Sequence, residues 1–364
     1  MTKSPKYMEI VNWTEKQIAE GKYKPNEKFL SESKLCETFG CSRQTIRRAF
    51  DILEQRKLIT RIQGSGTYIS SLDLHNSLKN SNNRIISKTI GLISTFLDNC
   101  VFPGIIRGIE SVLSAEGYAV QLISNNNLVA GEARALQLMM KRDLDGLIVE
   151  PTRSALPCVN IDLYQEAIQS GLPLLFIDSF YSELSVPYIA LDDEKAGYVA
   201  TEYLIKKGHR NIVGIFPHSN RQAHLRYLGY VKALSNYQIP IQEHLIFWHS
   251  KEDMQQVIHG HPLYKCILEE CTAVLCYNDV TAMMLISYIS KNGINVPSDI
   301  SVIGIDNSEL AKFGDLTSIA HPADQLGEAA AKMILSMIQG FEGKTILFPP
   351  KLIERSSVRE IILK

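Results

Sequence analysis

Residues 31 to 54, SESKLCETFGCSRQTIRRAFDILE, contain two short helical patterns separated by a tight turn. Ser31 is placed to cap the first helix, and Gly40 ends it, because glycine readily adopts the left-handed backbone that follows a helix. Ser42 is placed to cap the second helix. The apolar face of that second helix consists of Ile46, Ala49, Phe50 and Leu53. Two helices joined by so short a turn predict a helix-turn-helix.

The segments on both sides extend this unit. Apolar residues recur at helical spacing from Tyr7 to Ile18, which predicts a further helix before the pair. After the pair, LITRIQGSGTYI (58–69) places Gly64 and Gly66 between two β-prone runs, which predicts a hairpin. A nucleotide phosphate loop is the other interpretation of these glycines, but it would need a Lys-Ser or Lys-Thr ending and a following helix.

The helix that begins after Ser42 has a polar, basic face opposite its apolar one. That face consists of Arg43, Gln44, Arg47 and Arg48. Residues four apart lie on one side of a helix, so these side chains form two rows. Arginine can bond bidentately to guanine, and glutamine to adenine, in the major groove of DNA. Thr45, in the first turn, suits a phosphate contact. A solvated basic face is the alternative that this helix alone leaves open.

The charge distribution along the chain is uneven. Residues 1–70 carry 13 lysines and arginines against 8 acidic residues, a net charge of +5. The remaining residues carry 25 against 31, a net charge of −6. A small basic head before a mildly acidic body indicates a polyanionic partner for the head.

The segment 71–87, SLDLHNSLKNSNNRIIS, is rich in serine and asparagine, has no periodicity and is expected to be a linker. Beyond it, short apolar strand patterns alternate with helical segments, which predicts an α/β body with parallel sheets over residues 88–364. The body is large for one sheet, so we expect two lobes. The expected ranges are 88–187 and 321–345 for the first lobe, and 188–320 and 346–364 for the second.

Polar residues follow several of these predicted strands, at the carboxyl ends where open α/β sheets bind ligands. They are Glu150, Asp178, the pair Asn278 and Asp279, and Asp306. Carboxylate and amide groups that converge with one arginine suit a neutral polyol, because they accept hydrogen bonds from hydroxyl groups. The sequence therefore predicts a pocket for a small sugar between the lobes.

Composition and motifs exclude several classes of protein. The 364 residues are 45% hydrophobic and 21% charged, as in ordinary folded proteins of two or three domains. No run of eighteen apolar residues occurs, and MTKSPKYMEI lacks the layout of a secretory signal, so we expect a cytoplasmic protein without a membrane partner. The seven scattered cysteines favour reduced thiols over disulfides.

No Ser-His-Asp set, Gly-x-Ser-x-Gly elbow, Walker loop or nicotinamide fingerprint is present, so we expect no enzymatic activity and no cofactor. A metal site is another interpretation of the evenly spaced Cys266, Cys271 and Cys276, with His259 and His261 nearby. The apolar context of Cys276 favours buried thiols over metal ligands, and no metal is expected.

The ordered set of motifs in the head resembles the winged helix-turn-helix of the GntR family of bacterial regulators across residues 6 to 70. The resemblance rests on "SESKL", "FGCSRQTIRRAFDILE" and "LITRIQGSGTYI". Family members often carry an arginine where Ser33 stands, so a DNA contact from that position is not carried over. The resemblance implies a DNA-facing surface made of the residues named above, Arg43, Gln44, Thr45, Arg47 and Arg48, with Lys6 and Glu32, and a wing tip at Gln63, Gly64, Ser65 and Gly66.

The body resembles the LacI/GalR sensor domain, which shares its fold with periplasmic sugar-binding proteins. The resemblance rests on segments such as "FPGIIRGIESVLSAEGY", "LPLLFIDSF", "LDDEKAGYVATEYLIKKGHRNIVGI" and "VPSDISVIGIDNSELAKFGDLTSI". It implies that Phe102 stacks on the sugar and that Asp178, Arg226, Asn278 and Asp306 bond its hydroxyl groups. His321, at the third crossing between the lobes, is a further candidate, and Glu150 is a departure that alters which sugar fits.

A GntR-type head on a LacI-type sensor is similar to the bacterial arabinose-responsive repressors, on "VFPGIIRGIES", "IVEPTRSAL" and "LCYNDV". This resemblance implies a homodimer that represses arabinose-utilisation genes and leaves its operator DNA when L-arabinose binds. Another pentose or a sugar phosphate is an alternative effector. An aminotransferase-like body that binds pyridoxal phosphate is an alternative of another class, since such bodies also follow GntR-type heads.

Overall fold

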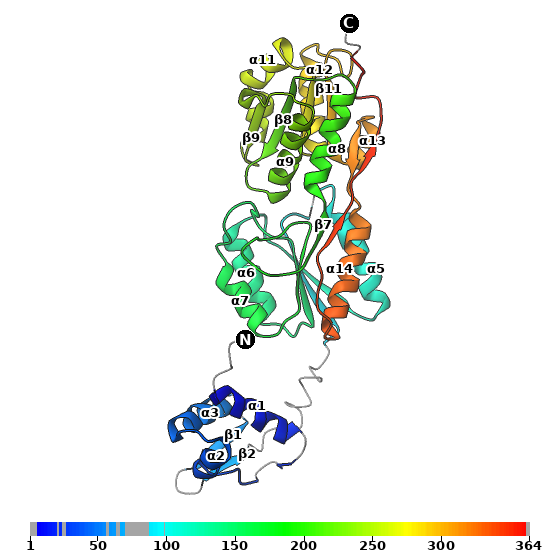
Figure 1. Cartoon of the computed structure of the whole chain (residues 1–364). Helices are drawn as coiled ribbons and strands as arrows, with labels where there is room; N and C mark the ends of the chain where they lie inside the picture. The colour runs from blue at the N-terminus through cyan, green and yellow to red at the C-terminus, as the bar shows by residue number, and fades with distance from the viewer. Residues whose placement is uncertain are drawn as a thin grey trace. The chain divides into compact units, whose positions relative to one another are not determined.

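The computed structural model describes residues 6–19, 22–23, 27–55, 58–62, 66–69, 87–97 and 99–361. The chain divides into two compact units, with the division between residues 86 and 87 (Figure 1). Of the segment expected to be a linker, residues 71–86 lie outside the described residues.

The first unit contains three helices and a hairpin. α1 spans Lys6–Ala19, α2 Glu32–Phe39 and α3 Arg43–Gln55, and β1 (Ile59–Ile62) pairs antiparallel with β2 (Gly66–Ile69). Ser31 accepts a hydrogen bond from the backbone N–H of Lys34, and Gly40 has φ 58°, so both predicted ends of α2 are confirmed. The helices and strands share a buried core that includes Ile10, Leu35, Ile46, Phe50, Leu53 and Ile69.

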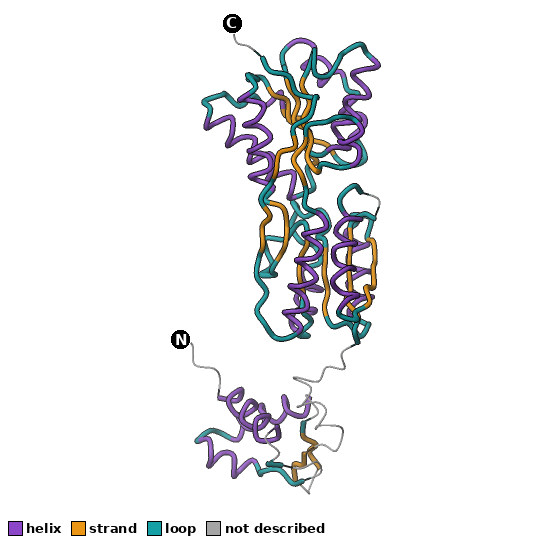
Figure 2. The backbone as a smooth tube through the Cα atoms, turned by 90° about the vertical axis from the view of Figure 1, so that its right-hand side faces the viewer, coloured by secondary structure: helices purple, strands orange, loops and turns teal. Residues whose placement is uncertain are grey.

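The second unit contains two six-stranded sheets, each with helices on both faces (Figure 2). The first sheet has the order β13-β7-β6-β5-β3-β4, and its strands pair in parallel. Its strands are β3 (Thr89–Ser94), β4 (Ala119–Ser124), β5 (Gly146–Val149), β6 (Leu174–Ile177), β7 (Tyr188–Leu191) and β13 (Ile346–Phe348). α5 (Phe102–Ala115) and α14 (Ala323–Ile338) cover one face, while α6 (Val129–Met140) and α7 (Ile161–Gln169) cover the other.

The second sheet has the order β14-β12-β11-β10-β8-β9 and is parallel except for its edge strand β14. Its strands are β8 (Ile212–Pro217), β9 (Ile246–His249), β10 (Ala273–Cys276), β11 (Ser301–Asp306), β12 (Ser318–Ala320) and β14 (Lys351–Ile353). α8 (Asp193–Lys206) and α9 (Arg221–Asn236) cover one face. α10 (Met254–Ile258), α11 (His261–Glu269) and α12 (Asp279–Lys291) cover the other, and the short η1 (Glu243–Leu245) and α13 (Glu309–Phe313) complete the lobe.

The predicted fold class, a winged helix-turn-helix followed by a two-lobed α/β body, is confirmed, but the predicted lobe boundaries need correction. β7 and β13 both pair within the first sheet, although they were expected in the second lobe from residues 188 and 346. The chain therefore crosses between lobes after Leu191 and after Phe348 instead. Both strands are short, and neither contains the long apolar run by which a buried strand is recognised in a sequence.

α8 and α9 lie side by side along the second sheet (Figure 1). They approach closely because glycines stand at the contact: a Cβ at Gly229 would collide with the carbonyl oxygen of Glu194, and one at Gly197 with that of Arg226. This approach brings the first turn of α8, with Asp193, against Arg226 on α9.

Among the described residues, no helix combines the length and apolar character needed to span a bilayer.

The close approach of α8 and α9 predicts that a methyl group added at Gly229 destabilises the fold. Gly229→Ala should lower the free energy of unfolding of the second unit by about 1 to 3 kcal/mol, because the methyl group meets backbone atoms that cannot rotate away. Denaturant unfolding of the full chain measures this. Ser235→Ala, at an exposed position of the same helix, is the matched control and should change stability by no more than about 0.5 kcal/mol. Equal stability of the two variants would contradict the packing argument.

Candidate functional site

The exposed face of α3 carries the predicted DNA-reading residues. Arg43, Gln44 and Arg47 are exposed. The Nε of Arg47 lies 3.2 Å from both carboxylate oxygens of Glu32, on α2, and thereby joins the two helices of the motif. Thr45 stands at the start of α3, where its backbone N–H donates to the Ser42 hydroxyl at 3.3 Å. The predicted cap at Ser42 is therefore present, and the first turn of α3 is oriented toward solvent.

Two other residues that were predicted to contact DNA, Arg48 and Lys6, interact with other parts of the first unit. The guanidinium of Arg48 lies 4.3 Å from the centroid of the Tyr7 ring, so it packs on α1. The Nζ of Lys6 donates to the carbonyl oxygen of Gly40 at 3.4 Å, at the turn between α2 and α3. Of the wing tip, Gln63, Gly64 and Ser65 lie outside the described residues. Gly66 is described and has φ 120°, a conformation that glycine tolerates best.

A cavity of about 320 Å³ lies between the two lobes of the second unit. It is formed by loops that follow strands of both sheets, as the rule for parallel α/β sheets predicts. Six of the seven predicted effector residues line it: Glu150, Asp178, Arg226, Asn278, Asp306 and His321. The sequence thus predicted the position of the pocket and six of its polar side chains. Asp279 does not line it, because its carboxylate accepts hydrogen bonds from the Ser308 backbone and the Ser318 hydroxyl instead.

Phe102 is the exception, and its predicted role is corrected. Its side chain is 1% exposed and belongs to the core beneath the first sheet. The reason is visible in α5, where apolar side chains recur every three or four residues from this position and form one buried stripe. Aromatic side chains that do line the cavity are Phe96, six residues earlier, and Tyr277. The helical periodicity could have signalled this, since it assigns Phe102 to the core.

Arg226 is the central cation of the pocket and is 3% exposed. Its Nε donates to Asp193 at 2.7 Å, its Nη1 donates to the carbonyl oxygen of Tyr277 at 2.7 Å, and the same nitrogen lies 3.8 Å from Asp306. Burial raises the pKa of Asp193 to about 6 and that of Asp306 to about 7, against the lowering effect of the nearby arginine. The pocket therefore contains a fixed positive charge beside carboxyl groups that burial makes weaker acids.

Asp178 is held from two sides. The Nε2 of His321 lies 2.9 Å from one of its carboxylate oxygens, and the Nε2 of Gln222 donates to the other at 3.1 Å. Burial alone would raise the pKa of Asp178, but the hydrogen bond and charge of His321 hold it below the usual value. The φ angle of 63° at Asp178 shows that the backbone after β6 is strained to present this carboxylate.

Glu150 closes another side of the pocket. One of its carboxylate oxygens accepts hydrogen bonds from the Ser94 hydroxyl at 3.0 Å and from the Thr95 backbone at 2.7 Å. Burial, with the nearby charge of Asp178, raises its pKa to about 7. The side chain therefore also orients the loop after β3, which carries Phe96.

Two buried nitrogen atoms at the cavity have no hydrogen-bond partner within the described part of the chain. They are Nδ1 of His321 and Nε2 of His249. An unpaired buried polar atom costs about 1 to 3 kcal/mol, so such atoms mark places where a ligand can supply the missing bond. Both lie in the same cavity, which favours a ligand with several hydroxyl groups.

Sequence reasoning missed several lining residues from both lobes. They are Asn99, Arg153, Asn220, Gln222, His249, Lys251 and Tyr277. His249 is the last residue of β9 and Lys251 follows that strand, whose short sequence IFWH was not recognised as a strand. The Nζ of Lys251 lies 3.5 Å from the centroid of the Phe96 ring, and both residues line the cavity. Recognition of β9 from its aromatic and β-branched residues could have identified His249 and Lys251.

The described cysteines are all free thiols, and no group of three or more potential metal ligands occurs among the described residues. Cys266, Cys271 and Cys276 lie buried in the apolar core behind the second sheet. Burial raises the pKa of Cys271 to about 12, so this thiol stays protonated and is a poor metal ligand.

Comparison with known proteins agrees with both units. Residues 6–69 match the model for bacterial regulatory proteins of the gntR family, and residues 201–358 match the periplasmic binding protein-like domain. The second match replaces the aminotransferase-like alternative for the body. A solved LacI family transcriptional regulator from Enterococcus faecium with bound ribose is 27% identical and has a TM-score of 0.65. The match covers 75% of this chain and 100% of that one.

Two curated relatives match nearly the whole chain. The arabinose metabolism transcriptional repressor of Halalkalibacterium halodurans is 35% identical, over 98% of this chain and 97% of that protein. The protein of the same name from Geobacillus stearothermophilus is 34% identical, over 98% of each chain. These relatives are DNA-binding repressors and not enzymes, in agreement with the expectation from the motifs. With its gntR-type head and its periplasmic binding protein-like body, the chain belongs to the family of arabinose metabolism transcriptional repressors.

Proposed function

We propose that this repressor binds L-arabinose between the lobes of its second unit and that sugar binding releases it from operator DNA in the cytoplasm. The observation that carries the proposal is the interlobe cavity with its buried arginine and its two unpartnered histidine nitrogens. The names of the two curated relatives, and the ribose bound to a related regulator, support a pentose as the effector.

The polar groups of the cavity match the chemistry of a neutral sugar. Asp178 and Asp306 can accept hydrogen bonds from hydroxyl groups, and Arg226 can donate to a pair of adjacent oxygens. The side-chain oxygen of Asn278 already accepts from the backbone and hydroxyl of Thr281, so its side-chain nitrogen is the group that can donate to a sugar. A hydrogen bond to a charged group contributes about 1.5 to 3 kcal/mol. Three or four such bonds support micromolar binding after the costs of association.

Arg153 and Lys251 also line the cavity, but the groups around Arg226 disfavour a phosphate there. Glu150, Asp178 and Asp306 all line the cavity, and Arg226 is already paired with Asp193. A phosphate group placed among these carboxylates would meet like charge in a region of low dielectric. A neutral pentose meets no such repulsion.

Release of DNA follows if the sugar favours one arrangement of the two lobes over another. Residues from both lobes line the cavity, so a bound sugar contacts both at once. The ligand can shift the equilibrium by no more than its difference in affinity for the two arrangements. In this proposal the head reads DNA with α3, and the operator is vacated when sugar binding stabilises the arrangement that binds DNA poorly.

Arg226 provides the test of the pocket. Arg226→Lys keeps a positive charge beside Asp193 but loses the planar fork, so the chain should fold and bind operator normally. The L-arabinose concentration that releases half of the operator complex should rise by about 10- to 100-fold, as expected for one charged hydrogen bond. Fluorescence anisotropy with labelled operator measures this.

Arg210→Lys, at an exposed position outside the cavity, is the matched control and should respond like the unmodified chain. Arg226→Ala is a poorer test, because it would leave the buried Asp193 without its partner and destabilise the fold. Normal sugar response in Arg226→Lys would show that the effector binds elsewhere.

The reading head is tested at Arg47. Arg47→Ala should weaken specific operator binding by about 1 to 3 kcal/mol, since an arginine fork on a base contributes about that much discrimination. Its sugar affinity should not change. Arg107→Ala removes the same charge from an exposed helix position in the second unit and should leave operator affinity within about twofold. Electrophoretic mobility shift with operator and competitor DNA measures the first effect, and calorimetry the second. A parallel loss of both activities in Arg47→Ala would instead indicate misfolding.

We also propose a homodimer, because paired heads suit operators with two half-sites. One surface of the second lobe supports this. Phe313 is 86% exposed, and beside it Leu310, Met283 and Met284 line a shallow groove with Tyr288. An exposed apolar surface of this kind marks an interaction site.

Phe313→Glu should therefore convert a dimer into a monomer, because a carboxylate in the buried interface would lack a partner. Analytical ultracentrifugation measures the change in mass. Phe341→Glu is the matched control, because Phe341 is also an exposed phenylalanine but lies in the first lobe, and this variant should remain dimeric. A monomeric unmodified chain would refute the dimer, and a dimeric Phe313→Glu variant would refute this surface.

A further inference from the structure

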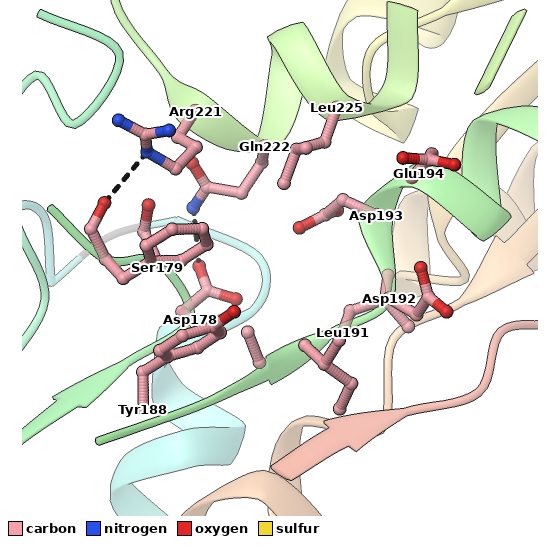
Figure 3. A pocket seen from close by; sticks show the side chains of 13 residues that line it. Asp178, Ser179, Tyr188, Leu191, Asp192, Asp193, Glu194, Arg221, Gln222 and Leu225 are labelled. Atoms are coloured by element: carbon pink, nitrogen blue, oxygen red, sulfur yellow. Dashed lines mark hydrogen bonds between the residues drawn. The ribbon is translucent and has the colours of Figure 1, made fainter. Parts of the chain in front are cut away.

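A second cavity of about 150 Å³ lies in the second unit, beside the effector pocket and close to the segments that cross between the lobes (Figure 3). Its walls come from the loop after β6, from β7 and the start of α8, from the first turn of α9, and from Leu347 on β13. Several of these residues are apolar, including Phe180, Tyr188, Leu191 and Leu225. None of the motifs discussed above accounts for this cavity.

Among the residues that the structure describes, the two cavities share two lining residues, Asp178 and Gln222. These two are bonded to each other, because the Nε2 of Gln222 donates to a carboxylate oxygen of Asp178 at 3.1 Å. In Figure 3 the side chain of Gln222 extends from α9 toward Asp178, and a dashed line marks the hydrogen bond between them. The pair therefore forms the common wall.

Asp178 and Gln222, which form this wall, differ in the number of side-chain hydrogen bonds that fix them. Asp178 is fixed by His321 as well, whose Nε2 lies 2.9 Å from its other carboxylate oxygen. Gln222 is 7% exposed, and the bond to Asp178 is the side-chain hydrogen bond that the structure records for it. Removal of the Gln222 side chain would thus open the wall and leave the carboxylate in place.

We propose that Gln222 is a specificity-determining residue, which closes the end of the effector pocket and sets the largest sugar that the protein accepts. The inference rests on the proposed function, since it assumes that a sugar occupies the larger cavity. With Gln222 in place, the pocket takes a pentose without a further substituent on the ring edge that faces the wall. Without it, a pentose ring with one added carbon extends into the second cavity, where apolar side chains receive the added group.

Four sugars test this in the full-length chain. L-Arabinose is the reference. D-Fucose has the same ring hydroxyl configuration with a methyl group added at C5, and the methyl α- and β-L-arabinopyranosides carry a methyl group on the oxygen atom bonded to C1. Because C1 and C5 flank the ring oxygen on opposite sides, the set samples both ring edges. Isothermal titration calorimetry gives each Kd, and the readout is the ratio of each larger sugar's Kd to that of L-arabinose.

In the unmodified chain this ratio should be about 10 or more for each larger sugar whose methyl group lies on the ring edge at the wall, as one extra carbon at a closed end of the pocket requires. In Gln222→Ala it should fall by about tenfold or more for at least one of them, and the position of that methyl group identifies the ring edge at the wall. Operator release by the same sugar, measured by anisotropy, should change in parallel.

Two further variants separate the wall from other effects. Gln222→Met keeps the volume but cannot bond to Asp178, so it should retain the selectivity of the unmodified chain. Leu225→Ala enlarges the second cavity without touching the wall, since Leu225 lines that cavity alone, and should also retain the selectivity.

The outcomes distinguish this inference from the proposed function. If the unmodified chain binds L-arabinose and Gln222→Ala gains none of the larger sugars, the proposed role of Gln222 is refuted while the function stands. Equal binding of all four sugars by the unmodified chain refutes the size limit directly. If the unmodified chain binds none of them, the proposed function fails, and the role of Gln222 fails with it.

Discussion

The buried guanidinium of Arg226 is the interaction on which the rest of the effector pocket depends. It joins the start of α8, through Asp193, to the strand end after β10, through the carbonyl oxygen of Tyr277. A charge in this position is stable only with its partners, because an unpaired buried charge costs several kcal/mol. The glycines at the contact of α8 and α9 are needed for the same reason, since without them the helices could not come close enough for the pair to form. The packing of α8 against α9 and the position of the charged groups in the pocket therefore depend on each other.

Hydrogen bonds connect the two lobes of the second unit. Arg221, at the first turn of α9, donates to the carbonyl oxygens of Ser154 and Phe180 in the first lobe. The backbone N–H of Ala155 donates to the carbonyl oxygen of Ser219, again across the lobes. A ligand that contacts both lobes can shift their arrangement by no more than its difference in affinity for the two arrangements.

In the first unit, the burial of one face of α3 determines which of its side chains are exposed. α3 places its apolar residues in the core, and this leaves Arg43, Gln44 and Arg47 exposed on the opposite side. Glu32 bonds to Arg47 and holds it between α2 and α3, so a residue expected on the DNA-facing surface lies where it can orient an arginine. The stack of Arg48 on Tyr7 shows the opposite case, in which a basic residue of the same helix serves packing as well.

The sequence by itself determined the elements that depend on local chemistry. Ser31, Gly40 and Ser42 bound their helices as predicted, because caps and left-handed glycines act within a few residues. The long apolar strand patterns gave the α/β class and the position of the pocket, since parallel strands place their carboxyl ends at one edge. Tertiary structure alone decided the lobe boundaries, the burial of Phe102, and the pairing of Arg226 with Asp193. It also decided the wall of Gln222 and Asp178, whose residues lie 44 positions apart. Such contacts depend on how separate helices and strands pack, and packing brings together residues that no local pattern connects.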